Sequence, residues 1–187
     1  MHSLCLVAGH SHDAALEPFA DFLKVERYKC FLEDADVTAM AEHLSVPRED
    51  LGALASRMPE WQEAEGGIED DRLFFWSTDN PKGKYDWYRV GGTFAGYLHL
   101  RVPRAPKWWE RLVGRGPTDR VNQARKHEVV LDAILADPPS ALVHNGEWYE
   151  APLTHEVARF QEWKQGFPRL FSSVGGEERL TVVDLHS

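Results

Sequence analysis

Acidic and histidine side chains stand at three places in this sequence where they could carry out acid–base chemistry. Asp86 lies in an aromatic stretch at the middle of the chain, and Asp184 and His186 alternate along the last apolar run. Residues i and i+2 of a strand face the same side of a sheet, so Asp184 and His186 share one face. If the first and last strands are neighbours, histidines of the first strand and its loop, such as His2, would meet them. The candidate catalytic groups are therefore Asp86, Asp184 and His186.

Two further histidines, His10 and His12, have a spacing that lets both side chains reach one metal ion. The spacing is similar to the start of the His-x-His-x-Asp-His motif of metallo-β-lactamase-like hydrolases. The sequence departs from that motif, because Asp13 directly follows the second histidine. His10 and His12 are therefore the candidate ligands of a divalent metal, with an exposed polar loop as the alternative. In the metal hypothesis a metal-bound water is the nucleophile, and an aspartate is the base or orients the ligands.

The aromatic stretch 80–100 supplies most of the candidate ligand-binding residues. Aromatic residues favour a pleated, half-buried surface, and paired glycines in such a run indicate a bend or a close approach by another backbone. We expect a long, bent strand pair at the centre of a sheet. Arg89 could stack on a ring or hold an anion, or it could be paired within a structural sheet. The candidates in this stretch are Trp87, Tyr88, Arg89, Gly91 and Gly92.

Gln123 and Lys126 extend this hypothesis to a second segment. Both lie in a stretch, 120–136, whose apolar residues predict a helix, and we expect them to face the glycine pair. Lys126 stands beside Arg125 and could hold a phosphate or carboxylate. If so, replacing Lys126 by alanine removes ligand binding and leaves stability almost unchanged.

Composition excludes several classes of protein. The formal net charge of -9 argues against a general nucleic-acid binder, because such proteins gather cations against the phosphates. No apolar run is long enough to span a bilayer, and the N-terminal apolar piece is too short for a signal peptide, so we expect a cytoplasmic protein. Cys5 and Cys30 are expected to be buried free thiols. The candidate basic patch comprises Lys107, Arg111, Arg115, Arg120, Arg125 and Lys126.

The order of the expected elements favours an α+β fold with a mainly antiparallel central sheet and helices packed on one side. Asn145-Gly146 between apolar runs predicts a hairpin. At 187 residues the chain suits a single domain, with an insertion around residues 103–120 that could be flexible. Strands are expected at 3–8, 24–31, 72–78, 84–90, 141–144, 147–149 and 179–186, and helices at 36–43, 45–58, 107–112, 120–136 and 154–165. Residues 59–71 are expected to be a solvated connection.

The central motif also resembles that of a known family. Asn80-Pro81, Lys84-Tyr85-Asp86-Trp87-Tyr88 and Val90-Gly91-Gly92-Thr93-Phe94 resemble the NPxxKWDWYxIGGRWxG core of an uncharacterised protein family of bacteriophages and bacteria. The last residues, 181–186, are similar to that family's terminal TVVDCHI. Thr93-Phe94 and Leu185 depart from the family's pattern. The resemblance implies a fold neighbourhood and candidate positions, not a reaction.

Two functions follow from these features. The favoured one is a binding or accessory protein of phage or bacterial type, which captures a small ligand or a host protein in an aromatic-lined pocket. Its support is the surplus of aromatic and glycine features without a nucleophile elbow or a phosphate-binding loop. The alternative is a small hydrolase or lyase that uses aspartate and histidine, with or without a metal.

Overall fold

The computed structural model describes residues 2–114, 116–152 and 157–187. Contacts within the chain group it into two compact units, where the sequence analysis expected one domain. The first unit combines the residues up to Asp21 with Lys82–Ser187, and the second is Phe22–Pro81. Each unit has a hydrophobic cluster of its own.

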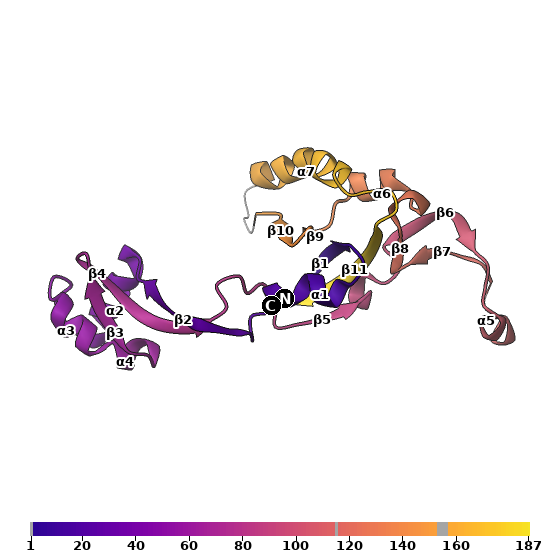
Figure 1. Ribbon diagram of the computed structural model, residues 1–187. Helices are drawn as coiled ribbons and strands as arrows, with labels where there is room; N and C mark the ends of the chain where they lie inside the picture. The colour runs from indigo at the N-terminus through magenta and orange to yellow at the C-terminus, as the bar shows by residue number, and fades with distance from the viewer. Residues whose placement is uncertain (1, 115, 153–156) are drawn as a thin grey trace. The chain divides into compact units, whose positions relative to one another are not determined.

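The first unit contains a six-stranded sheet built around two strands from opposite ends of the chain. The first and last strands run antiparallel side by side, with His2 opposite His186 and Ala8 opposite Leu180 (Figure 1). The strands are β1 (His2–Ala8), β5 (Trp87–Val90), β8 (Gln123–Arg125), β9 (Ala141–His144), β10 (Glu147–Glu150) and β11 (Arg179–His186). The order is β10-β9-β1-β11-β5, and β8 also pairs with β11. The pair β1–β9 is parallel and the other pairs are antiparallel, which confirms the mainly antiparallel sheet of an α+β fold.

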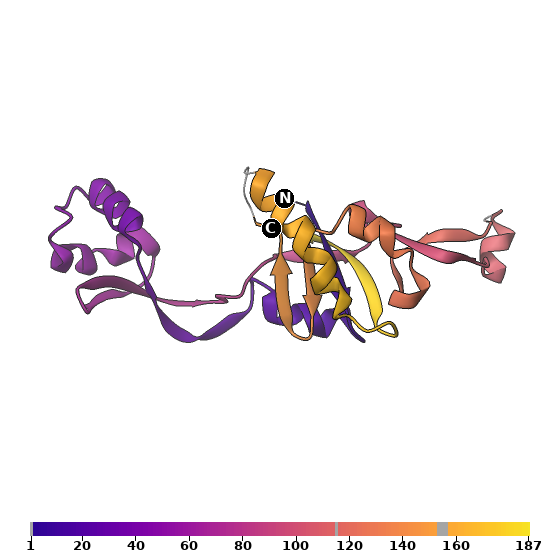
Figure 2. The ribbon, with the colours of Figure 1, turned by 90° about the horizontal axis from the view of Figure 1, so that it is seen from above.

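Helices α6 (Leu131–Ala136) and α7 (Val157–Ser172) cover one face of this sheet (Figure 2). Phe167 and Phe171 of α7 are buried with alternate residues of β1 and β11, because a strand presents every second side chain to one face. The short helices α1 (His12–Leu16) and η1 (Glu17–Phe19) contact the opposite face, where the Phe19 ring lies 5.2 Å from the ring of Trp148. Both faces of β1 are therefore buried, as its unbroken apolar run predicts.

The remainder of the first unit is a two-stranded sheet and the segments that join it to the main sheet. Strands β6 (Leu98–Arg104) and β7 (Thr118–Val121) pair antiparallel, and α5 (Trp108–Leu112) lies between them in the chain. Two short 3-10 helices, η2 (Gly92–Phe94) and η3 (Lys126–Glu128), follow β5 and β8. None of the described helices is long and apolar enough to cross a bilayer.

The second unit is a small α+β unit with its own core. Its sheet has the order β2-β4-β3, formed by β2 (Lys24–Phe31), β3 (Gly66–Glu69) and β4 (Arg72–Asp79). Its helices are α2 (Asp34–Leu44), α3 (Leu51–Ser56) and α4 (Met58–Gln62). Met40, Leu54 and Met58 are fully buried beside Leu73 of the sheet. The expected edge strand 24–31 and the strand 72–78 are confirmed.

Several expected elements are correct and have clear local causes. The hairpin at Asn145-Gly146 joins β9 to β10, and both turn residues have positive φ, as a two-residue hairpin loop requires. The first and last strands lie where the apolar runs predicted them. Both cysteines are free thiols, although Cys30 is only partly buried.

Three expected features in the first half of the chain and in the central stretch are wrong or misplaced. Ser45 does not begin a helix; it ends α2 in a left-handed conformation, and α3 begins after Asp50, whose carboxylate accepts a hydrogen bond from the amide of Ala53. The stretch 59–71 is not a simple connection, because it contains α4 and β3. The central stretch does not form a strand pair at the centre of a sheet. Instead β5 is four residues long and lies at the sheet edge, and β6 belongs to the other sheet.

Two expected helices in the second half also differ. The stretch 120–136 forms β7, β8 and η3 before α6, because its residues pair with β6 and β11 rather than along their own backbone. The first three residues of the expected helix 154–165 lie outside the described residues, and the described helix is α7. It continues past Gly166 to Ser172, since Phe167 and Phe171 anchor its last turns in the core.

Lys126 is a buried support of this fold. Its amine donates hydrogen bonds of 2.6 Å to the carbonyl oxygens of Phe171 and Val174, at the end of α7, and lies over the Phe171 ring. Burial lowers the pKa of Lys126, and the nearby Glu178 opposes that shift. A Lys amine can donate both bonds, and the Phe171 carbonyl also accepts a longer hydrogen bond of 3.3 Å from the amide of Val174. Lys126 thus ties β8 and η3 to the end of α7.

We predict that Lys126→Met lowers the free energy of unfolding by about 2–4 kcal/mol, because two buried carbonyl groups each lose a hydrogen bond from a charged donor. Urea unfolding followed by circular dichroism measures the change. The matched control is Lys164→Met in α7, whose amine lies over the Phe160 ring. Equal stability of the two variants would contradict the structural role of Lys126.

Candidate functional site

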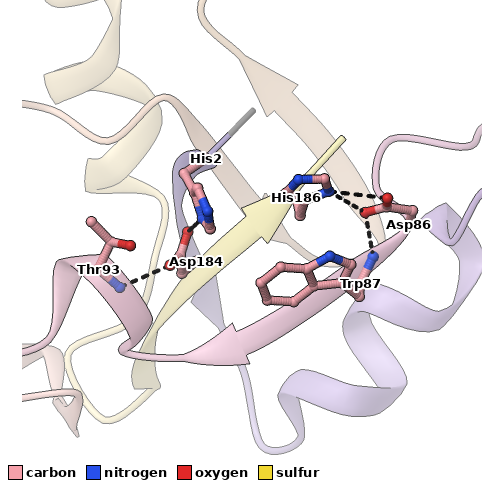
Figure 3. A network of polar contacts seen from close by, with 6 residues as sticks. All are labelled: His2, Asp86, Trp87, Thr93, Asp184 and His186. Carbon is pink, nitrogen blue, oxygen red and sulfur yellow. Dashed lines mark hydrogen bonds and ion pairs between the residues drawn. The ribbon is translucent and has the colours of Figure 1, made fainter.

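Three aromatic rings from three neighbouring strands form a row at one end of the main sheet. His2 of β1 pairs with His186 of β11, and His186 pairs with Trp87 of β5. The His2 and His186 ring centroids are 5.5 Å apart at an interplanar angle of 77°. Trp87 stacks on His186 at 5.1 Å and meets the edge of His2 at 5.8 Å (Figure 3). Together with Asp184 and Asp86 these residues make up what we call the histidine cluster.

Asp184 orients the first imidazole. One carboxylate oxygen lies 2.9 Å from Nδ1 of His2, and the other accepts a hydrogen bond of 2.8 Å from the amide of Thr93. The Asp184 side chain is only 3% exposed, whereas His2 is about half exposed. Burial raises the pKa of Asp184, but the hydrogen bonds from Thr93 and His2 outweigh it, so that its pKa is lowered overall. The cluster therefore holds a charged carboxylate under an accessible imidazole.

Asp86 plays the same part for the second imidazole. Both of its oxygens lie 3.0 Å from Nδ1 of His186, and one also accepts a hydrogen bond from the amide of Trp87 (Figure 3). Desolvation opposes ionisation, but the hydrogen bond from His186 and the backbone lower the pKa of Asp86. The carboxylate of this second pair is far more exposed than that of the first, since Asp86 is 45% and Asp184 3% exposed, whereas the His186 imidazole, at 35%, is less exposed than that of His2, at 48%.

The two carboxylates leave the same atom of each ring available. Because Nδ1 of His2 and of His186 faces a carboxylate, Nδ1 carries the proton in the neutral ring and Nε2 is the acceptor. Among the described residues neither Nε2 atom has a hydrogen-bond partner. Each oriented imidazole can therefore exchange protons at Nε2, as a base when it is neutral and as an acid when it is protonated.

The glycine pair after β5 makes room for Asp184. Gly92 has φ +51°, and a Cβ atom added there would lie 2.4 Å from the Cβ and Oδ2 of Asp184. Gly91 has φ +76°, and a Cβ atom there would lie 2.3 Å from the side-chain nitrogen of Asn122. These conformations and contacts exclude a side chain at both positions. The bend that the paired glycines indicated is present, but the groups that approach the two glycines closely are side chains rather than another backbone or a ligand.

The structure thus brings together four of the predicted residues and His2. Asp86, Asp184, His186 and Trp87 lie in the histidine cluster, and Gly92 packs against it. His2 was named in the sequence analysis as a residue that would meet them if the first and last strands were neighbours. Their pairing makes this contact, with a hydrogen bond between residues 182 positions apart.

Tyr88 and Arg89 lie outside the cluster. The Tyr88 hydroxyl donates to Asp13 of α1, and its ring meets those of Tyr85 and His12 on the other face of the sheet. Burial, followed by the effect of Asp13, raises the pKa of Tyr88 to about 12. Arg89 is an exposed residue of the edge strand, opposite Asp184 in register.

His10 and His12 are not placed as a pair of metal ligands on an extended chain. His12 is the first residue of α1, and Ser11 caps that helix. Nε2 of His12 lies 3.6 Å from Asp13, and His10 is exposed. Among the described residues no group of three or more His, Cys, Asp or Glu side chains is arranged to hold a metal ion.

Asn122, rather than Gln123 or Lys126, faces the glycine bend. Its side-chain oxygen accepts a hydrogen bond of 2.7 Å from the amide of Gly96. Gln123 donates to the hydroxyl of Thr181, and Lys126 points to the end of α7. Asn122 was not predicted because a helix was expected over 120–136, whereas this residue lies between β7 and β8.

Comparisons with protein-family models, with curated proteins and with solved structures find no match to this chain. The resemblance of the central motif to a phage and bacterial family therefore stays a prediction, and the geometry of the cluster is the basis of the functional argument.

We predict that Gly92→Ala destabilises the protein more than Gly146→Ala does. Both glycines have positive φ, so each substitution introduces strain of roughly 1–2 kcal/mol. A Cβ at Gly146 would meet nothing within 4 Å, whereas one at Gly92 would overlap Asp184 and add roughly 1–3 kcal/mol. Chemical unfolding of the two variants measures the difference, and equal losses would show that the approach to Asp184 is not a constraint.

We also predict that Asp184 makes stability depend on acid pH. Its pKa is lowered from 3.8 on folding, so the unfolded chain binds its proton more readily than the native state. This stabilisation is complete at a pH above the pKa of Asp184 in the unfolded chain. It is lost as the pH falls through the lower pKa of Asp184 in the folded protein. The free energy of unfolding should therefore decrease less between about pH 6 and about pH 3 in Asp184→Asn than in the wild type. Measurements at these two pH values give the change for each protein. Asp70→Asn, at an exposed turn, is the control and should follow the wild type.

Proposed function

We propose that the histidine cluster is an acid–base catalytic site of a small hydrolase or lyase. The observation that carries the proposal is the pair of adjacent imidazoles, each with Nδ1 on a carboxylate and with Nε2 unpartnered among the described residues. A lone histidine beside an aspartate is common in structural sheets. Two such pairs with adjacent rings can supply both the base and the acid that bond cleavage requires.

In the proposed reaction one imidazole takes up a proton and the other imidazole releases one. The neutral imidazole accepts a proton at Nε2 from water or a substrate hydroxyl, and the oxygen so activated forms the new bond to the electrophilic centre. The bond to the leaving group breaks with its electron pair, and the leaving oxygen takes a proton from Nε2 of the other, protonated ring. The pair of histidines ends with the same number of protons that it had at the start.

The surrounding residues support this exchange. Asp184 and Asp86 each hold the reactive tautomer and stabilise the imidazolium that forms when a ring takes up a proton. The two environments differ, since Asp184 is buried under the Thr93 amide and Asp86 is exposed. Trp87, 45% exposed, offers an aromatic surface beside both rings for an apolar part of the substrate.

The binding function favoured by the sequence has weaker support at this place. The cluster provides one exposed tryptophan and two imidazoles rather than an enclosed aromatic pocket. Its polar groups are arranged for proton exchange, which favours the hydrolase or lyase alternative here.

We predict that the wild type hydrolyses an activated ester, and that replacing the histidine that acts as the base, by His2→Ala or His186→Ala, lowers kcat/KM by roughly 10²–10⁴-fold, the range for a positioned base. The other substitution should have a smaller effect on these probes, because p-nitrophenolate leaves without taking up a proton. The probes are p-nitrophenyl acetate and bis(p-nitrophenyl) phosphate, followed by release of p-nitrophenol. His43→Ala, in the second unit beside Trp61, is the matched control and should keep the activity.

A second measurement tests the proposed state of the two histidines without any substrate. Nitrogen-detected histidine spectra should show the Nδ1–H tautomer for neutral His2 and His186, and Asp184→Asn should alter the spectrum of His2 alone. Wild-type turnover no faster than that of the His2→Ala/His186→Ala double variant on both probes would refute hydrolysis of these two ester classes. An Nε2–H tautomer at both rings would refute the catalytic arrangement itself.

A further inference from the structure

The first unit has a groove that is lined by none of the residues of the histidine cluster. It has a volume of about 800 Å³ and is bordered by β6, β7, β8 and η3, with Val90 of β5 at one side. This volume lies within the range of roughly 300–1,000 Å³ that is typical of small-molecule sites. We call it the arginine groove, after Arg101, Arg104 and Arg120, which line it.

The groove combines an apolar surface with neutral hydrogen-bonding groups. Val90, Leu100 and Val121 are half-buried along it, and Val102 extends the apolar lining to an exposed position. The amide side chain of Asn122 and that of Gln123 add donors and acceptors. This mixture suits an organic molecule with an apolar body, which would bury surface that is now in contact with water.

The charged groups of the lining are mainly positive. Three arginines and Glu128 line the groove, and Glu128 is engaged by the backbone amide of Arg125. Arg101 donates through Nε to the carbonyl oxygen of Val129, which leaves the other nitrogens of its guanidinium group as donors. Arg104 is paired with Glu110 at 3.1 Å. The structure gives the guanidinium group of Arg120 no partner among the described residues.

This concentration of positive charge stands out against the formal net charge of -9 for the whole chain. A cationic ligand would be attracted to most of the protein surface but repelled from the groove, whereas an anion would be favoured in the groove. A guanidinium group binds carboxylate, phosphate or sulfonate oxygens through paired N–H donors. We propose that the arginine groove binds a small amphipathic anion, with its acidic group on Arg120 and its apolar body along Val90, Leu100 and Val121.

This proposal does not depend on catalysis at the histidine cluster, because none of the cluster residues lines the groove. It agrees with the sequence-based hypothesis of small-ligand capture but changes the character of the site. The lining is aliphatic and cationic where an aromatic-lined pocket was expected. Gln123 is the residue from the predicted ligand-binding set that lies in it.

The test uses 8-anilinonaphthalene-1-sulfonate, a fluorescent amphipathic anion, on the full chain. We expect saturable binding, and a neutral analogue without the sulfonate, N-phenyl-1-naphthylamine, should bind more weakly. Arg120→Gln should weaken sulfonate binding roughly tenfold, since a hydrogen bond to a charged group is lost, and should leave binding of the neutral analogue unchanged. Decanoate and phenyl phosphate should compete, and inorganic phosphate should not.

Two variants distinguish the groove from other surfaces. Arg111→Gln removes the same charge from exposed α5, outside the groove, and should have no effect on the affinity. Trp108→Ser removes the most exposed aromatic ring of α5 and should also have no effect. The proposal is overturned if Trp108→Ser abolishes the binding, if Arg120→Gln and Arg111→Gln weaken it equally, or if the wild type does not bind the dye.

Discussion

The pairing of β1 with β11 is the interaction on which the rest of the first unit depends. Every other strand of the main sheet hydrogen-bonds to one of these two or, in the case of β10, to β9 beside them. The pair joins the two ends of the chain, and its loop-closure entropy is repaid by apolar side chains buried on both faces. It also places His2 next to His186 and over Asp184. The candidate catalytic site is thus a direct consequence of the strand register, and a one-residue slip would move His2 to the other face.

The second constraint is the narrow space between the glycine bend and β11. Gly91 and Gly92 turn the chain away from the sheet edge close to Asn122 and Asp184, so that the amide of Thr93 reaches a buried carboxylate. A buried carboxylate without such donors would tend to take up a proton. The bend therefore maintains the charge of Asp184, and this charge fixes the tautomer of His2. The glycine pair, which the sequence suggested as part of a ligand-binding site, instead makes room for Asp184 and the hydrogen bond from Thr93.

Strand β5 connects two sites of different chemistry. Its first residue, Trp87, belongs to the histidine cluster with the preceding Asp86, and its last residue, Val90, borders the arginine groove. The cluster presents two acceptor nitrogens and carboxylates, whereas the groove presents guanidinium groups over aliphatic side chains. An acidic protein with one locally cationic groove can draw an organic anion to a defined place. The two proposals have separate tests, because no residue is shared between the sites.

The sequence by itself determined the elements whose signals are local. These are the buried first and last strands, the strands β2 and β4 of the second unit, the hairpin at Asn145-Gly146 and the α+β class, because apolar runs and turn residues act over a few positions. It also identified Asp184 and His186 as a pair on one strand face. Only the tertiary structure decided that 120–136 contains strand residues and a 3-10 helix before α6, that Lys126 supports α7 and that Asn122 faces the glycine bend. It also decided that His2 and Asp86 complete two imidazole–carboxylate pairs. Strand pairing, burial and charge compensation join residues far apart in the chain, and no local pattern contains them.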